Sequence, residues 1–296
     1  MVVTNSSGAA QRNPGPSWGY RFIRLADRIL PEALFRPLRA AGTWAAIAAM
    51  PTQRSYSREY LRIALGREPR PIDVFRHFFA VCEALILRLR VADGASHTCV
   101  LEPGADDFGR WLASDRPVLL GTFHIGNSDL MGFMLAGQQG KRVHLIRLRV
   151  DNSHDTDALA SRFGSLLRFV WVNEPGELLF ALKEAGASGG AVALQCDRPE
   201  HSARTEPFEF LGAKRTFPFT IYHLAMIFGR PVILSFGAPF GRAQSMIYAS
   251  PAFEPFDGEP RKAALDRAKI HFQAFLLRVE AHLRVNPYQW LNFRPL

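Results

Sequence analysis

Residues 117–130 read PVLLGTFHIGNSDL, and this stretch decides the fold class. Its first half is a short apolar run, which is typical of a strand buried on both faces. Gly126, Asn127 and Ser128 then predict a turn with good helix-start residues, and Asp129 falls in the first turn of the helix that follows. A buried strand that leads through a polar turn into a helix indicates an α/β protein with parallel strands.

The rest of the chain repeats this alternation of apolar runs and helical patterns. Strands are predicted at residues 143–148, 169–172, 191–196, 231–236 and 245–248, and helices at 157–167, 175–185, 216–228 and 262–283. We therefore expect an α/β fold with a mainly parallel central sheet flanked by helices.

The sequence before the sheet predicts helices. Residues 1–17 are polar and contain Gly, Pro and Ser, which predicts a disordered tail without the apolar stretch of a signal peptide. Residues 18–95 predict a helical region that packs on the α/β core of residues 96–296 as one domain, with helices at 18–29, 55–65 and 72–91. Prolines at 31, 37 and 51 are expected to break this region into short helices. The pattern at 18–29 is amphipathic and basic, so it fits either packing on the core or contact with a membrane surface.

Composition limits the class of protein. The chain has 296 residues, 48% of them hydrophobic, and no segment long and apolar enough to span a bilayer. Its formal net charge of +9 comes mostly from scattered arginines, which favours anionic partners such as lipid head groups or an acidic carrier protein, with nucleic acid not expected. Three irregularly spaced cysteines indicate neither disulfides nor zinc, and fit a reducing cytoplasmic compartment.

His124 is the residue with the most evident chemistry, because it follows the apolar run at the expected carboxyl end of a strand. Reactive groups of open α/β sheets gather at such ends, and a neutral imidazole can take a proton from an alcohol. A nearby carboxylate, here Asp129, would fix the tautomer and stabilise the imidazolium. The spacing alone favours the other interpretation, a structural histidine followed by an acidic residue that the helix dipole stabilises.

The segment GTFHIGNSD at 121–129 resembles the H-x4-D/E motif of the lysophospholipid acyltransferase superfamily. More closely, residues 18–294 resemble the lipid A biosynthesis (Kdo2-lipid A lauroyl/myristoyl) acyltransferase branch. The further matching positions are Arg149 in HLIRLRVDN with Asp157 after it, Asp197 in ALQCDRP, Phe208, Phe210, Leu211 and Gly212 in PFEFLGAKRTFPF, and Pro287, Trp290 and Arg294 in NPYQWLNFRPL. The chain differs from that branch in having Arg198 after Asp197, where the family has Gln, and in lacking the usual N-terminal membrane anchor.

The resemblance implies transfer of a fatty acyl group from an acyl thioester to a hydroxyl of a lipid or glycolipid. It implies His124 as the general base and Asp129 as the residue that orients it. The substrate-binding residues it implies are Asn127, Arg149, Asp197, Phe208, Phe210 and Gly212, with the two phenylalanines as either acyl-channel or core residues.

Acyl carrier protein or acyl-CoA would be the donor, with no further cofactor and no metal. The protein would work in the cytoplasm, peripherally on the inner membrane. Two other functions fit the same residues: a hydrolase of acyl thioesters or lipids, and a non-catalytic lipid-binding protein.

Overall fold

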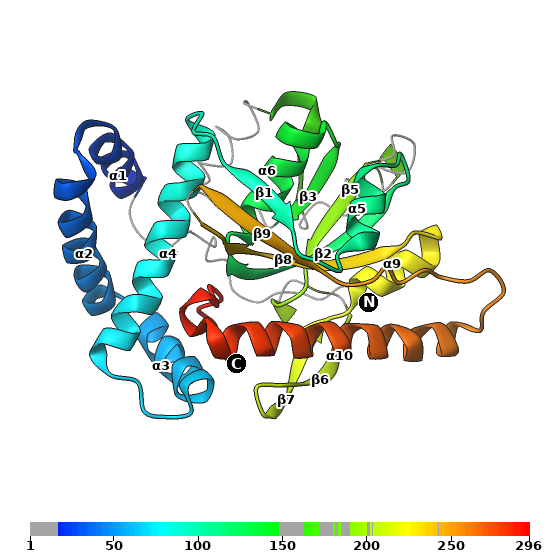
Figure 1. Cartoon of the computed structure of the whole chain (residues 1–296). Helices are drawn as coiled ribbons and strands as arrows, with labels where there is room; N and C mark the ends of the chain where they lie inside the picture. Colours follow the sequence, from blue (N-terminus) through cyan, green and yellow to red (C-terminus); the bar gives the residue numbers. More distant parts are fainter. Residues whose placement is uncertain are drawn as a thin grey trace.

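The computed structural model describes residues 17–147, 163–171, 180, 183–184, 190–199, 202, 204–241 and 243–296. The helical region before the sheet is confirmed, and it comprises α1 (Ser17–Ile29), α2 (Glu32–Ala49), α3 (Pro51–Leu65) and α4 (Pro71–Ala92). As Figure 1 shows, α4 lies between the sheet and the pair formed by α1 and α2. Within the described parts of the chain, no helix combines the length and the apolar composition needed to cross a bilayer.

Pro37 does not break the helical region as expected, because α2 continues through it. Proline costs a helix one backbone hydrogen bond, here the bond to the carbonyl of Ala33, and crowds that carbonyl. This position is only just past the first turn of α2, so most of the helix keeps its hydrogen bonds.

The predicted mainly parallel sheet is confirmed. Its seven strands have the spatial order β1-β9-β8-β2-β5-β3-β4, and every neighbouring pair is parallel except β8 and β9. Those two are antiparallel because the connection between them is too short for a crossover. The strands are β1 (Thr98–Leu101), β2 (Val118–Gly126), β3 (Val143–Arg147), β4 (Leu167–Trp171), β5 (Ala191–Gln195), β8 (Val232–Pro239) and β9 (Gln244–Ala249).

The helix predicted at 216–228 is wrong in its first part. It begins only at Thr220 as α9 (Thr220–Phe228), and the residues before it form β7 (Ala213–Pro218). This strand pairs with β6 (Thr205–Phe210) in an antiparallel hairpin separate from the main sheet. Leu211 and Gly212 turn the chain with φ angles of 51° and 77°, and positive φ angles at two successive residues are typical of a tight hairpin turn.

Further helices follow individual strands. They are α5 (Asp106–Leu112), α6 (Ser128–Gln139) and α10 (Arg261–Val285), and two short 3₁₀ turns lie at Gly164–Leu166 and Pro287–Gln289. The helices predicted at 157–167 and 175–185 fall largely outside the described residues.

Strand β2 is buried on both faces, which explains its continuous apolar run. Leu119 and Phe123 belong to one hydrophobic cluster, where Phe123 contacts the rings of Phe272 and Phe275 on α10. The alternate residues Val118 and Leu120 belong to a second cluster with residues of α5 and α6. Because both faces are occupied, the end of β2 is held rigidly, and that end carries His124.

Candidate functional site

Two neighbouring parallel strands bring a histidine and a carboxylate together. Thr122 of β2 lies opposite Gln195 of β5, so the residues two positions further, His124 and Asp197, also come side by side. The His124 ring Nδ1 lies 2.8 Å from Asp197 Oδ1, and the His124 backbone N–H donates to Oδ2 over 2.8 Å. One carboxylate therefore fixes both the backbone and the ring of His124.

The second ring nitrogen of His124 faces Gln195, at 2.9 Å from its Nε2. With Asp197 as the acceptor for Nδ1–H, the neutral ring has its free electron pair on Nε2, which accepts from the Gln195 amide. The His124 side chain is 9% exposed and that of Asp197 is fully buried. This arrangement selects one tautomer and points its basic nitrogen away from the carboxylate.

Asp129 is not the partner of His124, contrary to our expectation. Its Oδ2 lies 2.7 Å from an Nη atom of Arg88 on α4. The reason lies in the length of β2, which continues to Gly126 and so keeps His124 inside the strand rather than at the start of the turn. Asp129 lies in the first turn of α6, from which it reaches α4.

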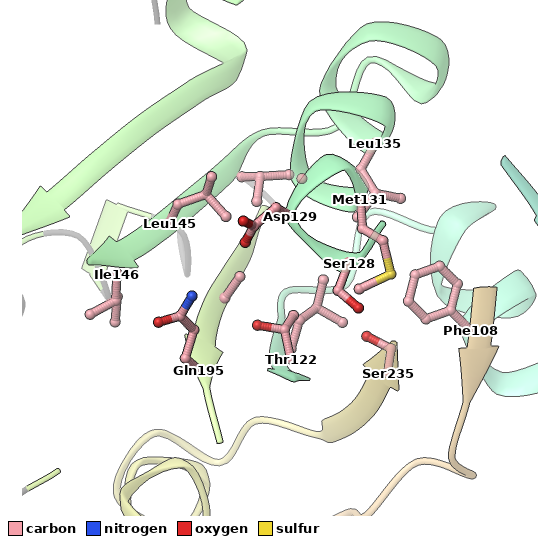
Figure 2. A pocket seen from close by; sticks show the side chains of 14 residues that line it. Phe108, Thr122, Ser128, Asp129, Met131, Leu135, Leu145, Ile146, Gln195 and Ser235 are labelled. Atoms are coloured by element: carbon pink, nitrogen blue, oxygen red, sulfur yellow. The ribbon is translucent and has the colours of Figure 1, made fainter. Parts of the chain in front are cut away.

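Gln195 and Asp129 nevertheless border the same small cavity, which lies between α6 and the sheet. Figure 2 shows them with Thr122 and Ser235 around this space. The remaining wall is mostly apolar and includes Leu145. The Ser235 hydroxyl is buried here and has no hydrogen-bond partner among the described residues. A substrate group that entered this cavity would therefore meet the Gln195 amide, the Asp129 carboxylate and three hydroxyls, those of Thr122, Ser128 and Ser235.

The turn between β2 and α6 is fixed by close contacts with β8 and β9. Gly126 has a φ angle of 49°, and a Cβ there would lie 2.8 Å from the carbonyl oxygen of Gly237. Asn127, predicted to bind substrate, is buried and donates from its amide to the Ser245 hydroxyl over 2.8 Å. Ser128 accepts from the Gly237 N–H over 2.8 Å. In this structure the Asn127 side chain is thus engaged in holding the turn.

Residues near the C-terminus form hydrogen bonds with the backbone of both His124 and Asp197. The Leu291 N–H donates to the His124 carbonyl over 2.7 Å, and the Asn292 amide donates to the Asp197 carbonyl over 2.9 Å. Arg198 Nε in turn donates to the Asn292 side chain over 3.1 Å. Neither Asn292 nor Gln195 was predicted as a site residue: both lie in the segments NPYQWLNFRPL and ALQCDRP, but neither stands at a position that matches the resemblance.

The other predicted binding residues lie elsewhere. Phe208 packs against Phe272 with ring centroids 4.6 Å apart, and Phe210 against Trp290 at 5.6 Å. Both are buried in the core, and Gly212 forms the hairpin turn next to them.

Arg149 and Asp157 lie outside the described residues. No group of His, Cys, Asp and Glu among the described residues is arranged to hold a metal ion.

A larger groove of about 630 Å³ lies beyond the carboxyl ends of β2 and β8. Residues of α4 form one wall, Arg39 of α2 contributes to it, and Gly126 and Asn127 line its inner end. The groove therefore reaches the chain two residues past His124.

No protein-family model and no curated protein matches this chain.

Proposed function

We propose that the protein is an acyltransferase that moves a fatty acyl group from an acyl thioester to a hydroxyl of a lipid or glycolipid. The observation that carries this proposal is the pair formed by His124 Nδ1 and the buried Asp197 carboxylate at 2.8 Å. A carboxylate that accepts one imidazole N–H raises the ability of the other nitrogen to take a proton. The resemblance to acyltransferases around His124 gives the reaction class.

The acceptor hydroxyl would replace the Gln195 amide as the hydrogen-bond donor to His124 Nε2. Nε2 would take the hydroxyl proton while the oxygen attacks the thioester carbonyl. The tetrahedral intermediate then breaks its C–S bond, and the imidazolium returns the proton to the departing thiolate. Asp197 would stabilise the transient imidazolium. N–H groups at the start of α6 would face the oxyanion, other than those of Asn127 and Leu130, which already donate to the carbonyls of Gly237 and Asn127.

Acyl carrier protein or acyl-CoA would supply the thioester, and the acceptor would belong to a membrane. We accordingly place the protein in the cytoplasm, peripherally bound to the inner membrane. The positive net charge of +9 suits both an acidic carrier protein and anionic lipid. Asp129 with Arg88 would border the reacting groups from the α6 side, instead of orienting His124 directly.

The test is acyl transfer from lauroyl-CoA or lauroyl carrier protein to a bacterial total-lipid extract, followed by mass spectrometry of the products. His124→Ala should lower the transfer rate about 10³-fold, because general-base catalysis of this kind contributes 10²–10⁴-fold. His223→Ala is the matched control, since His223 lies on α9 and contacts Arg261 instead of the site.

Unchanged transfer in His124→Ala would remove His124 from the mechanism. Release of free lauric acid at the same rate with and without lipid would instead identify a hydrolase.

A further inference from the structure

Helix α2 buries polar residues and exposes apolar ones. Its inward side consists of Phe35, Arg39, Thr43 and Ile47. The Arg39 guanidinium pairs there with Glu32 and Glu83. Beyond Arg36 the exposed residues of this helix include no charged and no polar side chain: Pro37, Leu38, Ala41, Gly42, Trp44, Ala45, Ala48 and Ala49.

The inward side is thus half apolar, and the outer side lacks the charged residues that an ordinary surface helix turns to water. A helix with this pattern is stable in contact with an apolar partner on its outer side. Within the described residues the ring of Trp44 stacks on Phe75 of α4, with centroids 4.9 Å apart, while the rest of the listed side is exposed to solvent. The outer side of α2 therefore points to a binding surface.

Helix α1 extends the same surface. Its exposed large apolar residues lie three and four positions apart, on one side of the helix. We define the apolar surface of α1 and α2 by their large hydrophobic side chains, which are 38–68% exposed: Phe22, Leu25, Ile29, Leu34, Leu38 and Trp44. Figure 1 shows the two helices together at one edge of the molecule, separated from the sheet by α4.

Arginines border this apolar surface. Residues 17–49 contain five arginines and only two acidic residues, Asp27 and Glu32. Both acids are already paired with arginines, Asp27 with Arg90 and Glu32 with Arg39, and Arg24 and Arg28 pair with Asp93. Arg21, next to Phe22 on α1, and Arg36 on α2 are exposed. The surface thus combines apolar side chains with the positive charge of Arg21 and Arg36.

We infer that the apolar surface of α1 and α2 binds the face of an anionic phospholipid bilayer, with both helices lying in the plane of the head groups. Apolar side chains would enter the acyl-chain boundary while the arginines contact lipid phosphates. Trp44 is of the residue type that concentrates at this depth of a bilayer. A second copy of the chain fits less well, because two basic surfaces repel each other.

This inference rests on the proposed function, which requires an acceptor held in a membrane. Arg39, on the inward side of α2, lines the large groove, and Gly126 and Asn127 line the same groove. Lipid binding itself requires no chemistry at His124, so it can be measured separately from acyl transfer.

The test is co-sedimentation of the full-length protein with vesicles of phosphatidylglycerol and phosphatidylcholine in equal parts. Leu34→Gln with Leu38→Gln should weaken binding by about tenfold or more without changing charge, because two leucines lose their apolar burial. Ile270→Gln with Leu277→Gln on α10 is the matched control, since these residues are 71% and 57% exposed. The control pair should bind like the wild type, and so should His124→Ala.

The charge contribution has its own variant. Arg21→Gln with Arg36→Gln should weaken binding to the anionic vesicles about fivefold per arginine and leave binding to pure phosphatidylcholine unchanged. Circular dichroism and the midpoint of thermal unfolding check that each variant folds.

Three results would overturn the inference. The first is failure of the wild type to bind anionic vesicles, and the second is binding of Leu34→Gln with Leu38→Gln as tight as that of the wild type. The third is a dimer, measured by analytical ultracentrifugation, that dissociates in this variant while vesicle binding is absent; that would make the surface an interface between two copies.

Discussion

His77 is buried and His124 is half-buried, and the two histidines have different hydrogen-bond partners. His77 on α4 lies with Nδ1 2.9 Å from the Ser57 hydroxyl, and its Nε2 contacts the carbonyl of Trp290. Burial lowers the pKa of His77 to about 4. His124 instead lies between the Asp197 carboxylate and the Gln195 amide. The first ring has no anionic partner and the second has one.

The difference separates a structural histidine from a candidate base. A buried ring between a hydroxyl and a carbonyl meets no negative charge that would stabilise its protonated form, so it serves as a cross-link. His77 joins α3, α4 and the chain end in this way, and its ring stacks on Phe293 with centroids 4.3 Å apart. A ring held by a carboxylate can carry a second proton for a moment, as general-base catalysis needs. The partners, and not burial alone, distinguish the two.

The largest expected effect concerns the carboxylate that serves His124. Asp197→Asn should lower kcat/KM for acyl transfer about 10³-fold, or about 4 kcal/mol, because an amide favours the wrong imidazole tautomer. Asp129→Asn should lower it about tenfold or less, since Asp129 pairs with Arg88 and contributes only to the cavity wall. Steady-state kinetics over a range of pH measures both. If Asp129→Asn proves the more damaging, the pairing of His124 must change when substrate binds.

Removing the other histidine should affect stability instead of catalysis. His77→Ala should lower the free energy of unfolding by about 3 kcal/mol, because it leaves a cavity and unsatisfied buried groups. Urea unfolding followed by circular dichroism gives this value. The kcat of His77→Ala should remain near that of the wild type under all conditions in which the variant is folded. A large loss of kcat at full stability would contradict the structural role of His77.

The low pKa of His77 also predicts a pH dependence of stability. The folded-state value of about 4 lies below the ordinary value of 6.5, so the unfolded chain binds this proton more readily. His77 therefore contributes its full stability above the ordinary pKa, and this contribution falls as the pH drops toward the folded value. From about pH 7 to about pH 5 the loss should be about 2 kcal/mol.

Urea unfolding at the two pH values measures this loss for the wild type and His77→Ala. Between these two pH values, His77→Ala should lose about 2 kcal/mol less stability than the wild type, because it lacks the titrating ring. Equal pH dependence in both proteins would assign the effect to other histidines.

The smallest expected effect tests the second pair of the site, Arg88 with Asp129. Arg88→Gln should change the free energy of unfolding by about 0.5 kcal/mol, because partly exposed ion pairs contribute little. Transfer should fall only slightly. A loss comparable to that of Asp197→Asn would show that the α4–α6 contact belongs to the catalytic machinery.

Several elements could be predicted from local pattern alone. The apolar run of β2 predicted a doubly buried strand, and the helical region before the sheet followed from its periodicity. The hairpin of β6 and β7 was missed because no strand was predicted for residues 205–215 and the following helix was expected to start at residue 216. Pro37 was expected to break the helix because the start of α2 was not predicted. A proline close to the start of a helix costs few hydrogen bonds, and α2 begins at Glu32, only five residues earlier.

The sequence by itself determined that His124 stands near the end of a buried strand and that α1 is amphipathic and basic. These features depend on neighbours within a few residues, which share one local geometry. Only the tertiary structure decided that Asp197, 73 residues away, holds the His124 ring, while Asp129 turns to Arg88. It also decided which side of α2 is exposed. Both depend on strand register and helix packing, which bring distant residues together and leave no mark in local spacing.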